Sequence, residues 1–339
     1  MTAPCFASID SFRSAFEKGL FDILKQDSLG AFILACANAT FTENIYQLMK
    51  PALLERFSYW QEKLLAGELK DAPPEDISVF TRLAELGMSA LEVTQYKQEG
   101  QWEIQYNQLR SFRPMRNAGH APDSISKPFD KDGFHFNKPF MQKEVFYEGN
   151  TAGKQVGMYY NKFPFADLHL LIVPEREQEK PQFLTEHDHD FAANMINVLS
   201  ENISGLVLAY NSYGASASVN HLHFQLCQRE ADLPVLLDGW LHNGGSEPYP
   251  LTAFKYSDTK DAWQKIQSLH EAVIPYNLLY LPQQVVVIPR KMQGSYEQPD
   301  WTAGLAWYEL AGGMTVSDRT VFDSLKQTHI SQVLASLAA

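Results

Sequence analysis

The sequence predicts an α+β fold in which a mainly antiparallel sheet is flanked by helices. The first observation is the order of apolar patterns between residues 156 and 227: strand, strand, helix, strand, strand. An antiparallel half-barrel with a helix on its face has this order. The second is a fainter copy downstream, with a helical pattern at 261–274 before strand patterns at 276–281 and 285–288. The third is a pair of amphipathic helical patterns ahead of the sheet, at 8–25 and 42–65.

The N-terminal hundred residues are predicted to be largely helical. Pro51 is expected in the first turn of the second helix or at a break in it, because proline has no backbone N–H. Residues 70–75 contain two prolines and indicate a loop, and residues 77–97 are helical or mixed. Alternation at Trp102, Ile104 and Tyr106 then predicts a strand within 101–109.

A long stretch without periodicity follows at residues 110–143, rich in Arg, Lys, Pro, Gly and Phe. A segment of this length without regular structure is usually functional or disordered, and its aromatic content argues against disorder. Two interpretations remain open: a loop packed over the sheet, or an arm that contacts substrate.

The next elements are the predicted sheet strands and their helices. Strands are expected at 156–161, 168–173, 206–210 and 221–227, with a helix at 186–202 for which Thr185 is the N-cap. The phrases HLLIVPE (169–175) and QVVVIPR (284–290) can be overlaid, which supports the second copy. Further short elements are expected at 307–313 and 319–325.

Composition limits the classes of function. With 339 residues and 45% hydrophobic content, the chain can form one large domain or two joined ones. Its net charge of −12 argues against nonspecific nucleic-acid binding. The sequence has no apolar run of about 18 residues and no evident secretion signal, so we expect no membrane span. Three cysteines without paired metal or disulfide spacing favour a cytoplasmic location.

The most informative pattern is GASASVNHLHFQL, residues 214–226. Polar and apolar residues alternate from 221 to 226, so a strand would place His221, His223 and Gln225 on one face. A neutral imidazole is a good nucleophile toward phosphorus. Spacing alone leaves two alternatives open, a metal site and a merely polar half-exposed face.

The small residues before the histidines predict a phosphate-binding loop. Backbone N–H groups in such a loop can approach a phosphate closely, and serine hydroxyls can add donors. The alternative is a turn that only links two strands. The candidate residues are Asn211, Gly214, Ser216 and Ser218.

The run NSYGASASVNHLHFQL (211–226) resembles the active-site segment of the histidine-triad (HIT) superfamily. Its HxHxQ form resembles the transferase branch: galactose-1-phosphate uridylyltransferase, diadenosine tetraphosphate phosphorylase and the GDP-hexose phosphorylases. The resemblance implies that His223 is the nucleophile that becomes nucleotidylated, that His221 orients it and that Gln225 binds phosphoryl oxygens. It also implies duplicated HIT-like half-barrels forming one continuous sheet with a pseudo-twofold axis.

Other segments extend the resemblance over roughly residues 100–325. KPFDKDGFHFNKPFMQKEVFYE (127–148), YNLLYLPQQVVVIPR (276–290) and AWYELAGGM (306–314) are similar to phosphorylase motifs. The predicted domains are therefore 1–100, a helical extension packed on the core; 101–230, the first HIT-like half with the active site; and 231–339, the second half without catalytic histidines.

Three further residues are predicted to bind substrate or phosphate. His169 and Asn161 match a histidine and an asparagine that recur near the site in the family, and Arg290 is a phosphate cation. The alternatives are a half-buried sheet histidine, a turn cap and a solvated surface charge.

The cluster His187 to Asp190 lies at an expected helix N-terminus, where acidic residues are ordinary, and adjacent helix positions do not face one another. We therefore expect no metal there. Some uridylyltransferases of the superfamily hold zinc through cysteines, and this chain has no matching cysteine cluster, so we expect no structural zinc and no cofactor.

The resemblance implies a nucleotidyltransferase, or phosphorylase, that acts through a nucleotidyl-histidine on a nucleoside-diphosphate-linked substrate, most like a GDP-hexose phosphorylase. A dinucleoside polyphosphate phosphorylase (ATP adenylyltransferase) is the first alternative. A hexose-1-phosphate uridylyltransferase follows, since that branch usually has proline where this chain has Leu222. A hydrolase and a non-catalytic nucleotide-binding protein remain open. The expected partners are a small nucleotide, inorganic phosphate or another phosphorylated acceptor, and a second copy in a homodimer.

Overall fold

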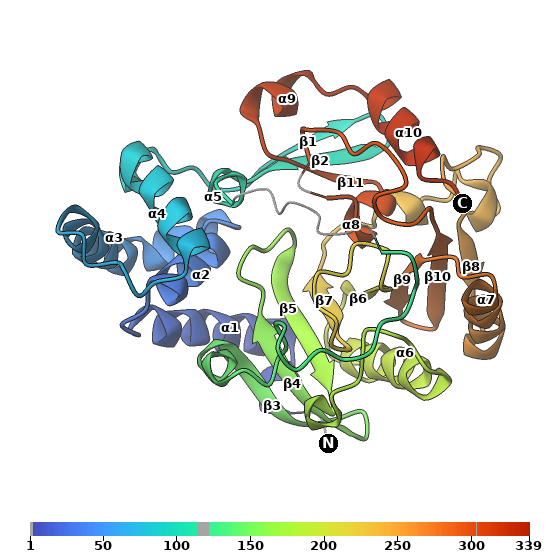
Figure 1. Cartoon of the computed structure of the whole chain (residues 1–339). Helices are drawn as coiled ribbons and strands as arrows, with labels where there is room; N and C mark the ends of the chain where they lie inside the picture. The colour runs from blue at the N-terminus through green and yellow to red at the C-terminus, as the bar shows by residue number, and fades with distance from the viewer. Residues whose placement is uncertain (1–2, 114–121, 303) are drawn as a thin grey trace.

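The computed structural model of the chain describes residues 3–113, 122–302 and 304–339. Its centre is an eight-stranded antiparallel sheet in the order β3-β4-β5-β7-β6-β9-β10-β8. The predicted α+β class is therefore confirmed (Figure 1). The strands are β3 (Val145–Thr151), β4 (Lys154–Tyr160), β5 (Asp167–Pro174), β6 (Leu206–Asn211), β7 (Phe224–Gln228), β8 (Phe254–Tyr256), β9 (Tyr276–Leu281) and β10 (Gln284–Pro289).

The sheet is built from two similar halves that meet along β6 and β9. Helix α6 (Glu186–Ser200) connects β5 to β6, and α7 (Thr259–Glu271) connects β8 to β9. The spatial orders β5-β7-β6 and β8-β10-β9 mirror each other, which confirms the predicted duplication. The overlay of HLLIVPE on QVVVIPR was wrong in detail, because β5 corresponds to β8, and β10 corresponds to β7. Both phrases are buried strands ended by proline, and that shared requirement explains their likeness.

A smaller sheet joins distant parts of the chain. It contains β1 (Gln95–Glu99), β2 (Trp102–Tyr106) and β11 (Gly313–Val316) in the order β1-β2-β11, with β2 and β11 parallel. The predicted strand at 101–109 is shorter than expected because Asn107 caps a helix, α5 (Gln108–Ser111): its side chain accepts the Arg110 N–H at 2.7 Å. Three C-terminal helices flank β11 in the chain, one before it and two after it: α8 (Trp307–Leu310), α9 (Arg319–Ser324) and α10 (Gln327–Ser336). The predicted domain limits at 100 and 230 stay a prediction.

Four helices precede the sheets: α1 (Ile9–Leu24), α2 (Leu29–Ala39), α3 (Glu43–Leu65) and α4 (Pro74–Leu86). Pro51 lies inside α3 instead of at its start or at a break. Pro51 and Gln47, whose carbonyl loses its helical partner, are both exposed, so water can bind that carbonyl. In the part of the chain that the structure describes, none of the helices combines the length and the apolar character of a membrane-spanning segment.

The two faces of the main sheet are covered differently. Side chains from α1, α2, α3, α6 and α7 pack with Leu170, Leu208, Leu226 and Leu278 in one large core. On the opposite face, the C-terminal elements pack over Val207, Ala209 and Leu279, while a segment around Phe136 and Met141 packs over Tyr159 and Val173. The residues of the HxHxQ motif that point to this second face lie between these C-terminal elements and the segment around Phe136, which we call the aromatic cover.

Candidate active site

The strand that carries the motif begins later than predicted. β7 starts at Phe224, so His221 and His223 lie in the segment that leads into it. The main chain there pairs with residues 180–182 instead of a strand: Leu222 N–H donates to Lys180 O at 2.8 Å. The alternation of faces still holds, because Leu222, Phe224 and Leu226 join the large core while both histidine rings contact Phe136 on the other face.

One ring nitrogen of His223 forms a hydrogen bond with the protein, and the other has no partner among the described residues. Its Nδ1 lies 2.8 Å from the carbonyl oxygen of His221 and donates to it. That bond leaves the lone pair on Nε2, for which no hydrogen-bond partner exists among the residues that the structure describes. The residue is 4% exposed, and the Phe136 ring centroid lies 5.4 Å from its ring centroid. The nucleophile candidate therefore lies beneath an aromatic cover.

The main-chain carbonyl of His221 accepts a hydrogen bond from the His223 ring, whereas the His221 ring binds the segment that covers both histidines. The Phe136 N–H donates to His221 Nδ1 at 3.2 Å, and His221 Nε2 donates to Arg176 O at 3.1 Å. An amide N–H can only donate, so the tautomer of His221 has its proton on Nε2. The ring thereby ties the 129–141 segment to the turn after β5.

Gln182 holds the main chain of His223. Its Oε1 accepts the His223 N–H at 2.9 Å, and its Nε2 donates to His223 O at 3.1 Å and to Asn211 O at 2.8 Å. Gln182 is 1% exposed. The turn that carries it is anchored by an ionic group in which Lys154, which is buried, and Lys180, which is partly exposed, each lie 2.9 Å from the buried Asp188.

Gln225 lies beside His223 on the same face, and its side-chain oxygen accepts two hydrogen bonds. Trp307 Nε1 donates to Oε1 at 2.9 Å, and His169 Nε2 lies 3.1 Å from the same atom. Because an indole N–H can only donate, the amide oxygen must face Trp307, and the NH₂ group faces away from both donors.

Burial keeps the three histidines neutral. Loss of solvation lowers the pKa of His223 to about 4. Burial, followed by the nearby His223, lowers the pKa of His221 to about 4, and burial lowers the pKa of His169 to about 3. At neutral pH each ring is therefore an uncharged imidazole, which is the nucleophilic form.

A cavity of about 450 Å³, whose lining includes neither His221, His223 nor Gln225, opens beside the Phe136 ring that covers both histidines. It shares Phe136, Leu171 and Val219 with the cover of the site, and Asn161 and Ser218 also line it. Phe134 and Phe140 are half exposed at this cavity, with ring centroids 6.0 Å apart. Of the aperiodic stretch 110–143, the part around Phe136 and Met141 is thus packed over the sheet and also borders the cavity, and residues 114–121 lie outside the described residues.

The other predicted loop residues are engaged by the protein. Ser216 Oγ donates to Leu305 O at 2.8 Å, and Asn211 Oδ1 accepts from Asn277 Nδ2 at 2.6 Å and from Trp307 N at 3.0 Å. Gly214 has a φ of +85° and packs so closely on Met292 that a Cβ would strike its sulfur. Of the loop candidates, Ser218 alone is exposed and lines the cavity.

Two of the remaining candidates are buried away from the cavity. His169 is 0% exposed, and its Nδ1 accepts the Phe165 N–H at 3.4 Å while Nε2 serves Gln225. Arg290 is also 0% exposed; its guanidinium donates to Leu305 O, to Tyr296 Oη and to Lys291 O. His169 is therefore a hydrogen-bond partner of Gln225, and Arg290 is part of the C-terminal core.

Residues 187–190 lie in the first turn of α6, where Thr185 is the N-cap as predicted: its side chain accepts the Asp188 N–H. His189 Nδ1 bonds Tyr280 Oη at 2.9 Å and Nε2 bonds Thr259 O at 3.0 Å, while Asp188 pairs with two lysines. Both side chains therefore have protein partners inside the fold.

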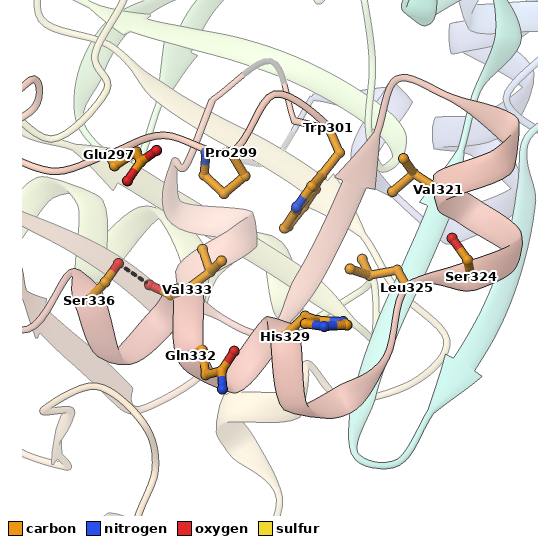
Figure 2. Close-up of a pocket in the computed structure, with 10 residues that line it drawn as sticks. All are labelled: Glu297, Pro299, Trp301, Val321, Ser324, Leu325, His329, Gln332, Val333 and Ser336. Atoms are coloured by element: carbon orange, nitrogen blue, oxygen red, sulfur yellow. Dashed lines mark hydrogen bonds between the residues drawn. The ribbon is translucent and has the colours of Figure 1, made fainter.

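Another cavity, of about 700 Å³, lies elsewhere, between residues 297–301 and helices α9 and α10 (Figure 2). Trp301, Leu325 and Val333 give it an apolar wall, and none of the predicted site residues lines it. Its described lining contains no Lys or Arg, which makes it a poor place for phosphate groups.

Comparison with known proteins gives one family match. Residues 89–227 match the family model described as GDPGP1-like, N-terminal domain. This segment is similar to the N-terminal domain of GDPGP1-like proteins. The match bears out the resemblance to the GDP-hexose phosphorylases, and the matched residues contain the whole HxHxQ motif.

Two curated proteins that are similar to this chain carry the same name. GDP-D-glucose phosphorylase 1 of Danio rerio is 33% identical over 100 residues, which is 30% of this chain and 29% of that protein. GDP-D-glucose phosphorylase 1 of Macaca fascicularis is 30% identical over 129 residues, or 36% of this chain and 33% of that protein. The matched segments thus span about a third of each relative's length.

Among solved structures, yeast Ap4A phosphorylase Apa2 in complex with AMP is similar to this chain. The TM-score is 0.49 at 19% identity, and the match covers 72% of this chain and 87% of that one. The same enzyme in complex with Ap4A gives a TM-score of 0.47 at 17% identity, over 73% of this chain and 90% of that one.

Sequence reasoning missed two residues that hold the candidate site together. Gln182 lies 41 positions from His223, and Trp307 lies 82 positions from Gln225 and outside the matched segment. Trp307 stands in the AWYELAGGM run, which is similar to a phosphorylase motif, but this resemblance implies no role for the tryptophan. Gln182 carried no sequence signal beyond a polar residue before a helix cap.

Proposed function

We propose that the protein is a nucleotidyltransferase that splits a nucleoside-diphosphate hexose with inorganic phosphate, most like a GDP-hexose phosphorylase. The observation that carries the proposal is the state of His223: its Nδ1–H bonds a carbonyl at 2.8 Å, and burial lowers its pKa to about 4. Such a ring presents a neutral Nε2 lone pair as its reactive atom. The GDPGP1-like segment and the two named relatives support the choice of substrate class.

The proposed reaction has two displacements at one phosphorus. In the first, the Nε2 lone pair of His223 bonds the α-phosphorus, and the bond to the bridging oxygen breaks. The hexose 1-phosphate leaves with that electron pair. In the second, an oxygen of inorganic phosphate bonds the same phosphorus, and the P–N bond breaks. The products are a nucleoside diphosphate and the original imidazole.

Charge on the transferring phosphoryl group has to be stabilised during both steps. We propose that the Gln225 NH₂ group donates to one non-bridging oxygen, because its amide oxygen is already held by Trp307 and His169. Ser218, exposed beside the cavity, is the proposed second donor. His221 keeps the nucleophile oriented through its carbonyl.

We assign the nucleoside to the 450 Å³ cavity. Phe134 and Phe140 supply exposed aromatic surface for a base, and Asn161 supplies an amide for a hydroxyl. Because Phe136 covers both histidine rings, we propose that its segment shifts when the α-phosphate approaches Nε2.

Several further statements are proposals of the same kind. Three free cysteines, two of them buried, favour a reducing cytoplasm. We propose that the reaction needs neither metal nor cofactor, so activity should survive treatment with a chelator. We also propose a homodimer, which sedimentation equilibrium would measure.

Intact-mass spectrometry after exposure to GDP-hexoses, UDP-hexoses and diadenosine tetraphosphate, with and without phosphate, tests the proposal. A guanylyl adduct that phosphate discharges is the expected result. An adenylyl adduct from the dinucleotide would favour the dinucleoside polyphosphate phosphorylase, and a uridylyl adduct would favour the uridylyltransferase. Turnover without phosphate would mean a hydrolase, and binding without any adduct or turnover would mean a non-catalytic nucleotide-binding protein.

A further inference from the structure

The Gln225 side chain is held by a residue from the second half of the fold. Trp307 begins helix α8, and its indole N–H reaches the amide oxygen of Gln225 at 2.9 Å. The second donor to that oxygen, His169 Nε2 at 3.1 Å, comes from β5 of the first half. With two donors on Oε1, the amide has one favourable orientation.

Trp307 is itself fixed in place. It is 0% exposed, and its main-chain N–H donates to Asn211 Oδ1 at 3.0 Å. Its ring lies in the core of the second sheet face, with its centroid 5.5 Å from that of Phe165. The indole N–H therefore reaches Gln225 from a position that is held at the main chain and at the ring.

The amide needs this support because the last torsion of a glutamine side chain is broad, so its oxygen and nitrogen exchange places at small cost. Near an anionic phosphoryl group, an outward NH₂ attracts the oxygens of that group and an outward carbonyl repels them. A residue that binds only the carbonyl end of the amide therefore determines whether the NH₂ group or the carbonyl oxygen points toward the reacting phosphoryl group.

We propose that Trp307 is a positioning residue for the transfer: it holds Gln225 so that the amide NH₂ faces the phosphoryl group bound at His223. The inference rests on the proposed nucleotidyl transfer. It gives the second half, which has no HxH pair, a direct part in the site of the first half.

The test compares two matched variants in steady-state phosphorolysis. Trp307→Phe keeps an aromatic ring and removes the N–H. Trp240→Phe makes the same change at an indole that also lies in the C-terminal core and donates to Pro234 O at 2.7 Å, away from Gln225. Loss of one hydrogen bond predicts a kcat about tenfold lower for Trp307→Phe with KM unchanged. For Trp240→Phe we expect both constants to stay at the wild-type values. An equal fall in both variants would mean a merely structural role and would overturn the inference.

A second measurement does not depend on turnover. The Trp307 indole ¹H–¹⁵N resonance, assigned by its loss in Trp307→Phe, should shift in Gln225→Ala and stay near its place in Gln225→Glu, which keeps an acceptor oxygen. An unmoved resonance in Gln225→Ala, in a protein that still forms the nucleotidyl adduct, overturns the inference alone. A wild-type protein that forms no adduct overturns the proposed function, and the positioning role with it.

Discussion

Gln182 holds His223 at both main-chain polar groups, accepting its N–H at 2.9 Å and donating to its C=O at 3.1 Å. Replacement by alanine leaves these groups and Asn211 O buried without partners. We expect Gln182→Ala to lower the free energy of unfolding by about 3 kcal/mol, as measured by denaturant titration. Gln178→Ala is the control, since that side chain is exposed and bonds Glu175 at 3.0 Å. Equal stability of the two variants would contradict the role of Gln182.

Removal of the proposed nucleophile should separate chemistry from folding. His223→Ala loses the Nε2 atom while its main-chain bonds to Gln182 stay possible, so we expect no nucleotidyl adduct and an unchanged circular dichroism spectrum. Label incorporation is followed by intact mass with the same nucleotide sugars. An adduct that persists in this variant would place the nucleophile elsewhere.

The rate of adduct formation should be insensitive to mild acid. His223 must be neutral to attack, and its pKa is lowered to about 4. We therefore expect the single-turnover rate, measured without phosphate, to stay level from pH 7 to about 5 and to fall near pH 4. An inflection near pH 6.5 would indicate a solvated imidazole.

The lowered pKa values of His223 and His221 also make the free energy of unfolding depend on pH. An unfolded histidine binds its proton near pH 6.5, whereas folded His223 and His221 bind theirs near pH 4. Between these values the unfolded chain holds more protons, so this part of the stability is complete above pH 6.5 and is lost as the pH falls toward 4. The difference in unfolding free energy between pH 7 and pH 5 should therefore be smaller in His223→Asn than in wild type. Equal pH dependence would contradict the buried, neutral state.

The aromatic cover predicts restricted access to the histidines. The Phe136 ring lies 5.7 Å from His221 and 5.4 Å from His223, centroid to centroid. We expect Phe136→Ala to increase the rate at which diethyl pyrocarbonate modifies these two histidines severalfold, as followed by peptide mass mapping. Phe134→Ala is the control, because that ring is half exposed. Modification at the wild-type rate in Phe136→Ala would show that the ring does not limit access.

The sequence predicted the strands of the main sheet well where apolar strand patterns alternate with helical patterns. It did not predict elements that are buried on nearly every side or elements that are only partly buried. Helix α2 was not predicted because it is buried on nearly every side and shows no polar stripe. Edge strand β3 was not predicted because most of its residues are only partly buried. Three-residue β8 is too short to show alternation.

The geometry of the candidate site was predictable where its residues are neighbours in sequence. Spacing alone brought His221, His223 and Gln225 to one face. Gln182 and Trp307 reach them only because the fold brings distant segments together, and no local pattern records such contacts. The burial of His169 and Arg290 was likewise hidden, since it depends on what packs over β5 and on the C-terminal core.

The continuous hydrogen bonding between β6 and β9 has a consequence for dissecting the molecule. Every residue of β6 is buried, and its outer edge is paired from Leu208 to Asn211 with the second half. A fragment cut near residue 230 would present that row of amides and carbonyls to water beside bare aliphatic surface. Such an edge recruits other chains, so the isolated piece should aggregate even though it contains every histidine of the motif.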